Sequence, residues 1–168
     1  MKKKVKEPRA RQFMYVQDLD HLKVKEDDLS DILNKSGALE WVYINHDKDP
    51  KKDEDGKIIR PHIHAVLKYE NPQKVSTVAN LFKDQSQYVD VWKGRIANAY
   101  SYLLHETEEA REQGKHVYKA SEAVASFDFP ARMKSIRAKI TKSPKYISSL
   151  VDQYAEGKLT YDELEQLI

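Results

Sequence analysis

Two neighbouring segments of the sequence decide the fold: residues 39–45, LEWVYIN, and residues 62–69, HIHAVLKY. Both are rich in aromatic and β-branched residues, which favour extended backbone. Polar and apolar side chains alternate at the start of the second segment, as on a strand with one buried face. A charged stretch, residues 47–60, separates the two segments. We therefore expect an antiparallel hairpin with a long polar loop.

The segments on either side of this hairpin add two strands and three helices. Strands are predicted at residues 9–17 and 87–92, and helices at residues 27–36, 75–82 and 95–112. The resulting order, β-α-β-β-α-β-α, is that of a split βαβ, ferredoxin-like plan. The sequence therefore predicts an α+β protein whose strands pair antiparallel.

The composition excludes several classes of protein. The chain has 168 residues, of which 40% are hydrophobic and 33% charged, which suits one domain and a short appendage. Without cysteine it has no disulfide and no thiol nucleophile. No apolar run approaches the roughly 18 residues that cross a bilayer, and a Walker-type phosphate loop is absent. We expect a protein of a reducing compartment, the cytoplasm, with no membrane partner.

Charge is segregated along the chain, although the formal net charge is only +2. Residues 2–11 hold six basic side chains and one acidic one, and residues 131–145 hold six basic ones and none acidic. Such segments suit contacts with a phosphate backbone, and they equally suit a solvated surface. The composition changes near Pro130. We therefore expect a domain at 1–130, and at 131–168 a basic linker with short helices.

The histidines of the hairpin form a candidate metal site. His62 and His64 are two residues apart on a strand, so both imidazoles point to the same side. In a hairpin, His46 at the end of the first strand lies beside them, and Asp49 adds a carboxylate. This donor set suits Mn²⁺, Zn²⁺ or Co²⁺, and Mg²⁺ less well. The pattern leaves open ordinary polar strand positions, or Asp47 or Asp53 in place of Asp49 as the ligand.

A tyrosine in the expected helix 95–112 is a candidate nucleophile. By helical spacing Tyr100 belongs to the apolar stripe, whereas Tyr102 aligns with Asn98 and His105 on a more polar face. A tyrosine hydroxyl near a metal-bound phosphate can attack it and form a covalent phosphotyrosine. Asn98, Tyr100 and His105 would then support the nucleophile or bind DNA. The pattern alone equally fits two tyrosines that only pack.

Four motifs in a fixed order carry a resemblance to a known family: HDKD at 46–49, PHIHAVLKY at 61–69, AYSYLLHE at 99–106 and GKHVY at 114–118. Together they resemble the rolling-circle replication initiators of small Gram-positive plasmids, which belong to the HUH endonuclease superfamily. The resemblance runs from about residue 9 to residue 129. It implies a five-stranded antiparallel sheet with helices on both faces.

The resemblance also implies roles for individual residues. His62 and His64 match the metal-binding HUH pair. His46 and Asp49 match the upstream histidine and aspartate that complete the metal site, which prefers Mn²⁺ or Mg²⁺ in this family. Tyr102, directly before Leu-Leu-His, matches the nucleophile.

The implied reaction is site-specific nicking and rejoining of single-stranded DNA, exposed in a hairpin at the double-strand origin. It leaves a 5′-phosphotyrosine and a free 3′-OH that a host polymerase extends while a host helicase unwinds the duplex. Basic residues then become candidates for DNA contacts, namely Arg9, Arg11, Lys93 and Arg95. Initiators of this type carry a larger C-terminal region for oligomerisation. Residues 131–168 would be its beginning, and a homo-oligomer is expected only where that region is complete.

Two alternative functions remain open at this stage. A conjugative relaxase is also an HUH enzyme, but relaxases often place the tyrosine near the N-terminus and use three histidines. In this chain the tyrosine follows the HxH pair and one candidate ligand is an aspartate, which favours the initiator. From a different class, a metal-dependent DNA-binding regulator would keep the same residues with an inert tyrosine.

Overall fold

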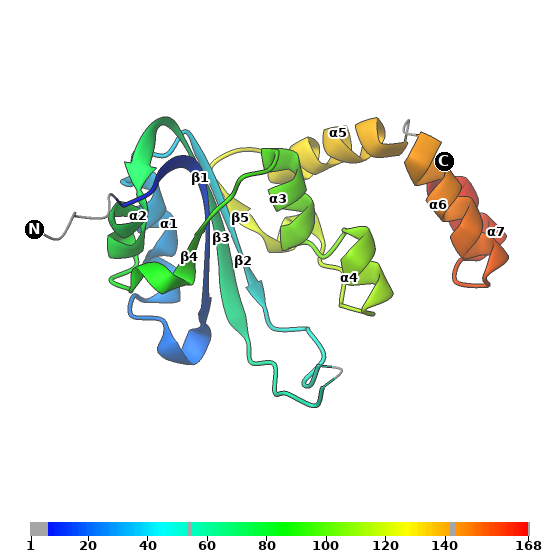
Figure 1. Cartoon of the computed structure of the whole chain (residues 1–168), viewed down its shortest axis with the longest axis horizontal. Helices are drawn as coiled ribbons and strands as arrows, with labels where there is room; N and C mark the ends of the chain where they lie inside the picture. The colour runs from blue at the N-terminus through cyan, green and yellow to red at the C-terminus, as the bar shows by residue number, and fades with distance from the viewer. Residues whose placement is uncertain (1–6, 54, 142–143, 168) are drawn as a thin grey trace, which may run out of the picture. The chain divides into compact units, whose positions relative to one another are not determined.

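A computed structural model describes residues 7–53, 55–141 and 144–167. The chain forms two compact units, Met1–Phe129 and Pro130–Ile168. The first is built on one five-stranded sheet in the order β4-β1-β3-β2-β5 (Figure 1). Its strands are β1 (Arg9–Asp18), β2 (Glu40–His46), β3 (His62–Lys74), β4 (Val89–Val91) and β5 (Val124–Ala125). Every strand pair in this sheet is antiparallel, which confirms the predicted α+β class.

The register of the β2–β3 hairpin decides which side chains share a face. His46 pairs with His62, and Ile44 pairs with His64. The rings of His62 and His64 lie 4.8 Å apart, whereas Ile63 between them is fully buried in the apolar core. Both imidazoles of the HxH pair therefore lie on one face of the sheet, as the alternation predicted.

Helices cover both faces of the sheet, as the family resemblance implied. On one side, α1 (Leu29–Asn34) and α2 (Val75–Leu81) close the main apolar core (Figure 1). On the other side lie α3 (Ile96–Leu103) and α4 (Glu108–Glu112). Buried members of the core include Phe13, Tyr15, Leu29, Leu33, Trp41, Ile63, Leu67 and Phe82. This main core occupies one side of the sheet. The HxH side chains lie on the other side, where Val42, Ile44 and Val66 are buried as well.

Several predicted boundaries differ from the structure. The expected helix at 27–36 begins as a 3₁₀ helix, η2 (Glu26–Asp28), and continues as the shorter α1. The expected strand at 87–92 begins as η3 (Ser86–Tyr88), which leaves only the three residues of β4 extended. The strand β5 has two residues, too few to show a period in the sequence. The other 3₁₀ helices are η1 (Leu19–His21) and η4 (Ala120–Glu122).

The prediction of one helix over 95–112 is wrong, because the chain breaks it into α3 and α4. His105 adopts a left-handed conformation with φ 58°. Its N–H donates to Tyr102 O (3.1 Å), and the N–H of Glu106 donates to Ser101 O (3.0 Å). These are the two hydrogen bonds of a Schellman motif, where glycine is usual. Because this position holds a histidine and not a glycine, the sequence carries no signal of a helix end there.

The second unit is helical. Its helices are α5 (Phe129–Thr141), which starts at the last residue of the first unit, α6 (Pro144–Ala155) and α7 (Tyr161–Leu167). Leu150 on α6 and Leu164 on α7 are buried where these two helices pack together. The stretch expected as a basic linker is therefore helical over most of its described length. Within the described ranges, no helix has the length and apolar character that crossing a membrane requires.

The start of α4 offers a test of the broken helix. The Oγ1 of Thr107 accepts a hydrogen bond from Ala110 N at 3.2 Å. Because that amide would lose its acceptor, we expect Thr107→Ala to lower the free energy of unfolding by about 1 kcal/mol. Thr107→Ser keeps the hydroxyl and should stay near the wild type. Urea denaturation measures both, and equal losses would contradict the capping role.

Candidate active site

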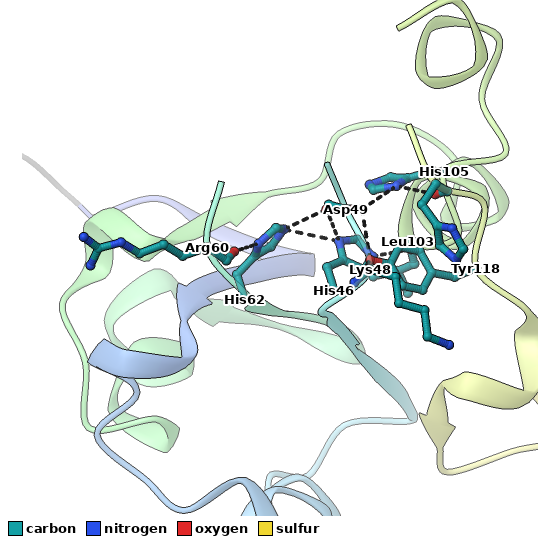
Figure 2. A network of polar contacts seen from close by, with 9 residues as sticks. His46, Lys48, Asp49, Arg60, His62, Leu103, His105 and Tyr118 are labelled. Atoms are coloured by element: carbon teal, nitrogen blue, oxygen red, sulfur yellow. Dashed lines mark hydrogen bonds and ion pairs between the residues drawn. The ribbon is translucent and has the colours of Figure 1, made fainter. Parts of the chain in front are cut away.

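Four histidines and an aspartate meet beside the paired ends of β2 and β3. Figure 2 shows three of these histidines, His46, His62 and His105, around Asp49. His46 ends β2 and pairs with His62, which begins β3. One ligand atom from each of His46, His62 and His64 lies within 4.8 Å of the others, and the same holds for His46, Asp49 and His105. The structure therefore brings together the four ligands predicted from sequence and adds His105 to them.

Two backbone carbonyls fix the tautomers of the paired histidines. His46 Nε2 lies 2.6 Å from Leu103 O, and His62 Nδ1 lies 2.7 Å from Arg60 O. A carbonyl only accepts, so each of these nitrogens carries the proton. The opposite nitrogens, His46 Nδ1 and His62 Nε2, then present lone pairs to each other across 3.3 Å. Two acceptors at this distance need a shared positive partner.

Asp49 places a carboxylate oxygen near these two unprotonated nitrogens. Its Oδ2 lies 3.9 Å from His46 Nδ1 and 3.8 Å from His62 Nε2. Atoms that ligate one divalent ion at about 2.0–2.2 Å lie roughly 3–3.5 Å from one another. The three donor atoms are therefore close to the spacing that one ion would impose.

Burial prepares the histidines as ligands. His64 is 6% exposed, and its Nδ1 has no hydrogen-bond partner among the described residues. Burial lowers the pKa of His64, and it lowers the pKa of His46 to about 4. Both are neutral at pH 7, which is the form that binds a metal. The unpaired nitrogen and the facing lone pairs together show that these residues fit a divalent cation.

His105 lies against Asp49. Its Nδ1 is 2.8 Å from His116 O and 3.4 Å from Asp49 Oδ1, so this nitrogen carries a proton and donates. Burial lowers the pKa of the His105 imidazole, which favours its neutral form. The left-handed backbone at His105 places this ring among the other histidines. We therefore assign His105 a part in holding Asp49.

Tyr118 is a member of the site to which sequence reasoning gave no role. Its hydroxyl donates to Asp49 Oδ1 at 2.9 Å and accepts from Lys48 N at 3.0 Å. Its ring stacks on His46 with centroids 4.5 Å apart and planes 15° apart, and the side chain is buried. Burial raises the pKa of this hydroxyl, which keeps it a donor. Its place in the motif GKHVY was the one signal that could have found it.

The two tyrosines of α3 have different surroundings, as helical phase predicted. Tyr100 is fully buried, and its hydroxyl donates to Glu40 Oε1 at 2.5 Å. Tyr102 is 38% exposed, and its ring lies 6.1 Å from that of His64. Burial is the main cause that raises the pKa of Tyr102. Tyr100, a candidate supporting residue by its place on the same helix, is therefore a core residue.

A pocket of about 670 Å³ connects Tyr102 to the histidines. Its lining includes Asp49, His62, His64, Tyr102 and His105, together with Lys52 and Lys115. The two lysines were not singled out in the sequence, because charged residues are common throughout this loop and around α4. The carboxylates of Asp53 and Asp55 also line the pocket, so each lysine offers a local contact for a phosphate group and the lining as a whole is not positively charged.

The basic residues proposed for DNA contacts lie in different places. Lys93 and Arg95 are exposed between β4 and α3, and Asn98 is exposed on α3. Arg9 and Arg11 are exposed near the start of β1, whose other end pairs with His62. A strand rises about 3.4 Å per residue, so Arg9 lies roughly 30 Å from that end and is not part of this site. Of the basic stretch at the N-terminus, residues 2–6 lie outside the described residues.

The hydrogen bond from Tyr118 makes a prediction about metal affinity. Removing a group that orients a ligand typically weakens metal binding 10–100-fold. We therefore expect Tyr118→Phe to weaken Mn²⁺ binding by about 10-fold or more, measured by titration calorimetry. Tyr161→Phe, at an exposed tyrosine in the second unit, is the matched control. Unchanged Mn²⁺ affinity in Tyr118→Phe would show that Asp49 does not need this bond.

The buried histidines make stability depend on pH. Their folded-state pKa values lie below the usual 6.5, so the unfolded chain binds more protons as the pH falls from about 7 to about 4. The free energy of unfolding of the metal-free protein should therefore fall over that range. One pKa unit corresponds to about 1.4 kcal/mol, so His46 alone contributes at most about 3 kcal/mol. Urea denaturation in EDTA at several pH values measures the slope.

Two variants identify the groups responsible for that slope. His64→Gln should show a shallower pH dependence, because one buried titrating group is gone. His21→Gln, at an exposed residue of η1, should keep the wild-type slope. A stability that is flat between pH 7 and pH 5 in the wild type would refute neutral burial of the cluster.

Comparisons with known proteins identify the family of this chain. Residues 5–130 match the family model described as plasmid replication protein, origin binding domain. A curated relative, the "Replication protein" of Onion yellows phytoplasma (strain OY-M), is 31% identical over 104 residues, which cover 56% of this chain and 26% of that protein. The chain thus spans about a quarter of that relative's length. The matched region contains the whole sheet and every residue of the cluster. The chain therefore belongs to the family of plasmid replication protein origin-binding domains.

Proposed function

We propose that this domain nicks and rejoins one strand of origin DNA, with Tyr102 as the nucleophile. One observation carries the proposal: the partly exposed Tyr102 lines the same pocket as Asp49, His62 and His64. A nucleophile and a candidate metal site that share a pocket can act on one phosphate. The family match supports the choice of an origin as the DNA target, and it favours an initiator over a relaxase.

The proposed reaction exchanges one phosphodiester for another. The hydroxyl oxygen of Tyr102 bonds to phosphorus while the bond from phosphorus to the 3′-oxygen breaks. The tyrosine proton passes to solvent, and the departing 3′-oxygen takes up a proton. The products are a 5′-phosphotyrosine and a 3′-OH end. Attack of a 3′-OH on the phosphotyrosine rejoins the strand, so no nucleotide is consumed.

The residues of the pocket have distinct parts in this proposal. Burial, and then the carboxylates of Glu109 and Asp90, raise the pKa of Tyr102, so its hydroxyl is protonated in the protein without DNA. Lys52 and Lys115 would attract the strand. A Mn²⁺ or Mg²⁺ ion held by the three histidines and Asp49 would polarise the scissile phosphate.

The partners follow from the products. The substrate would be single-stranded or hairpin DNA at the double-strand origin, which the described family supports through its origin-binding role. The free 3′-OH would be extended by a host DNA polymerase while a host helicase opens the duplex in the bacterial cytoplasm. Assembly into a homo-oligomer would depend on further regions of the protein.

A second candidate function is origin binding without cleavage, since the family description names binding alone. In that case the histidine cluster would be a structural metal site and Tyr102 a surface contact. The two functions differ in one respect that can be measured. A nickase forms a covalent bond to DNA, whereas a binding protein does not.

Replacing Tyr102 tests the proposal. The protein is incubated with Mn²⁺ and a randomised single-stranded DNA library, and SDS-resistant adducts are collected and sequenced. The wild type should form an adduct, and EDTA should prevent it. Tyr102→Phe should form none above background, because only the attacking oxygen is lost.

Tyr100→Phe is the matched control on the same helix. Tyr100 is fully buried, so its variant should keep the adduct if the protein remains folded by circular dichroism. Loss of the adduct in Tyr100→Phe but not in Tyr102→Phe would show that we assigned the wrong tyrosine. DNA binding without any adduct in the wild type would favour the binding-only function.

A further inference from the structure

Trp92 lies on the same face of the sheet as the histidine cluster. It follows β4, and its backbone N–H donates to Gln12 O at 2.9 Å, which extends the pairing with β1. Val89 on β4 packs in the apolar core, so by alternation Trp92 belongs to the opposite face. Its ring contact with Tyr102, at 6.0 Å between centroids, agrees with that placement.

The Trp92 side chain is held by the turn that follows it. The indole Nε1–H donates to Arg95 O at 3.0 Å. The side-chain amide of Gln12 donates to Gly94 O at 2.9 Å and to Trp92 O at 3.3 Å. A Cβ at Gly94 would lie only 3.3 Å from the indole Nε1, so the turn closes tightly on the ring. The indole is therefore fixed in place before any ligand arrives.

Three rings form a row toward the cluster. Tyr102 lies between Trp92, at 6.0 Å, and His64, at 6.1 Å. The planes of Trp92 and Tyr102 are tilted by 52°, so these two rings are not stacked on each other. Trp92 is partly exposed, and its neighbours Lys93 and Arg95 are exposed. Proteins that bind single-stranded nucleic acid combine aromatic rings with basic side chains in this way.

We propose that Trp92 is a stacking platform for a nucleobase of the bound single strand, next to the phosphate that Tyr102 attacks. The position beside the scissile phosphate rests on the proposed function. Lys93 and Arg95 would bind the flanking phosphates. Because every base has a flat apolar face, the platform accepts any base and fixes the position of the strand rather than its sequence.

Fluorescence can test this contact directly. The chain has two tryptophans, and the other, Trp41, is 3% exposed in the core with its N–H bonded to Asn34 Oδ1. A base stacked on Trp92 should therefore quench the part of the tryptophan emission that comes from Trp92, while the emission of buried Trp41 stays unchanged. The whole chain is titrated in EDTA, so that no cleavage occurs, with dT20 and with an abasic strand of the same length and charge.

The proposal expects quenching by dT20 and none by the abasic strand. In Trp92→Leu the quenching should disappear, and dT20 binding, measured by anisotropy of a labelled strand, should weaken about 5-fold to 100-fold. Trp92→Phe keeps a smaller ring and should bind with intermediate affinity. Circular dichroism establishes that each variant is folded.

Several results would overturn the proposal. Binding of dT20 without quenching, equal quenching by the abasic strand, unchanged binding by Trp92→Leu, or no binding at low salt would each do so. The adduct assay separates this inference from the nicking reaction. An adduct without quenching rejects the platform and leaves the nickase, whereas quenching without an adduct rejects the nickase and leaves a base-stacking site.

Discussion

The pairing of His46 with His62 across the β2–β3 hairpin is the constraint on which the site depends. Side chains alternate along a strand, so a shift of one residue would turn His62 and His64 into the apolar core. Burial of Ile63, Ala65 and Leu67 on the opposite face opposes any such shift. Packing of the apolar core thereby fixes the register of β2 and β3, and this register determines which histidines lie together as candidate ligands.

The spacing of polar and apolar residues predicted which side chains share a face of a strand or of a helix. A period of two residues placed His62 and His64 on one face, and a period of 3.6 separated buried Tyr100 from exposed Tyr102. The strand order along the chain was sufficient for the fold class. His46 and Asp49 needed one further assumption, the hairpin, and the structure brings both to the cluster.

The features that sequence reasoning missed come from tertiary structure. Tyr118 meets Asp49 across 69 positions of the chain, and no period connects them. The break at His105 needs a left-handed residue, and glycine, the usual sign of one, is absent there. Trp92 approaches Tyr102 only because β4 lies at the edge of the sheet beside β1.

The hydrogen bond from His46 Nε2 to Leu103 O joins two parts of the site that are otherwise separate. Leu103 directly follows Tyr102 on α3, so one helix end carries the proposed nucleophile and also fixes the proton of a candidate ligand. Movement of α3 away from the sheet would displace the tyrosine and release the His46 ring in the same event. The position of the Tyr102 side chain and the orientation of the His46 ring therefore depend on the same end of α3.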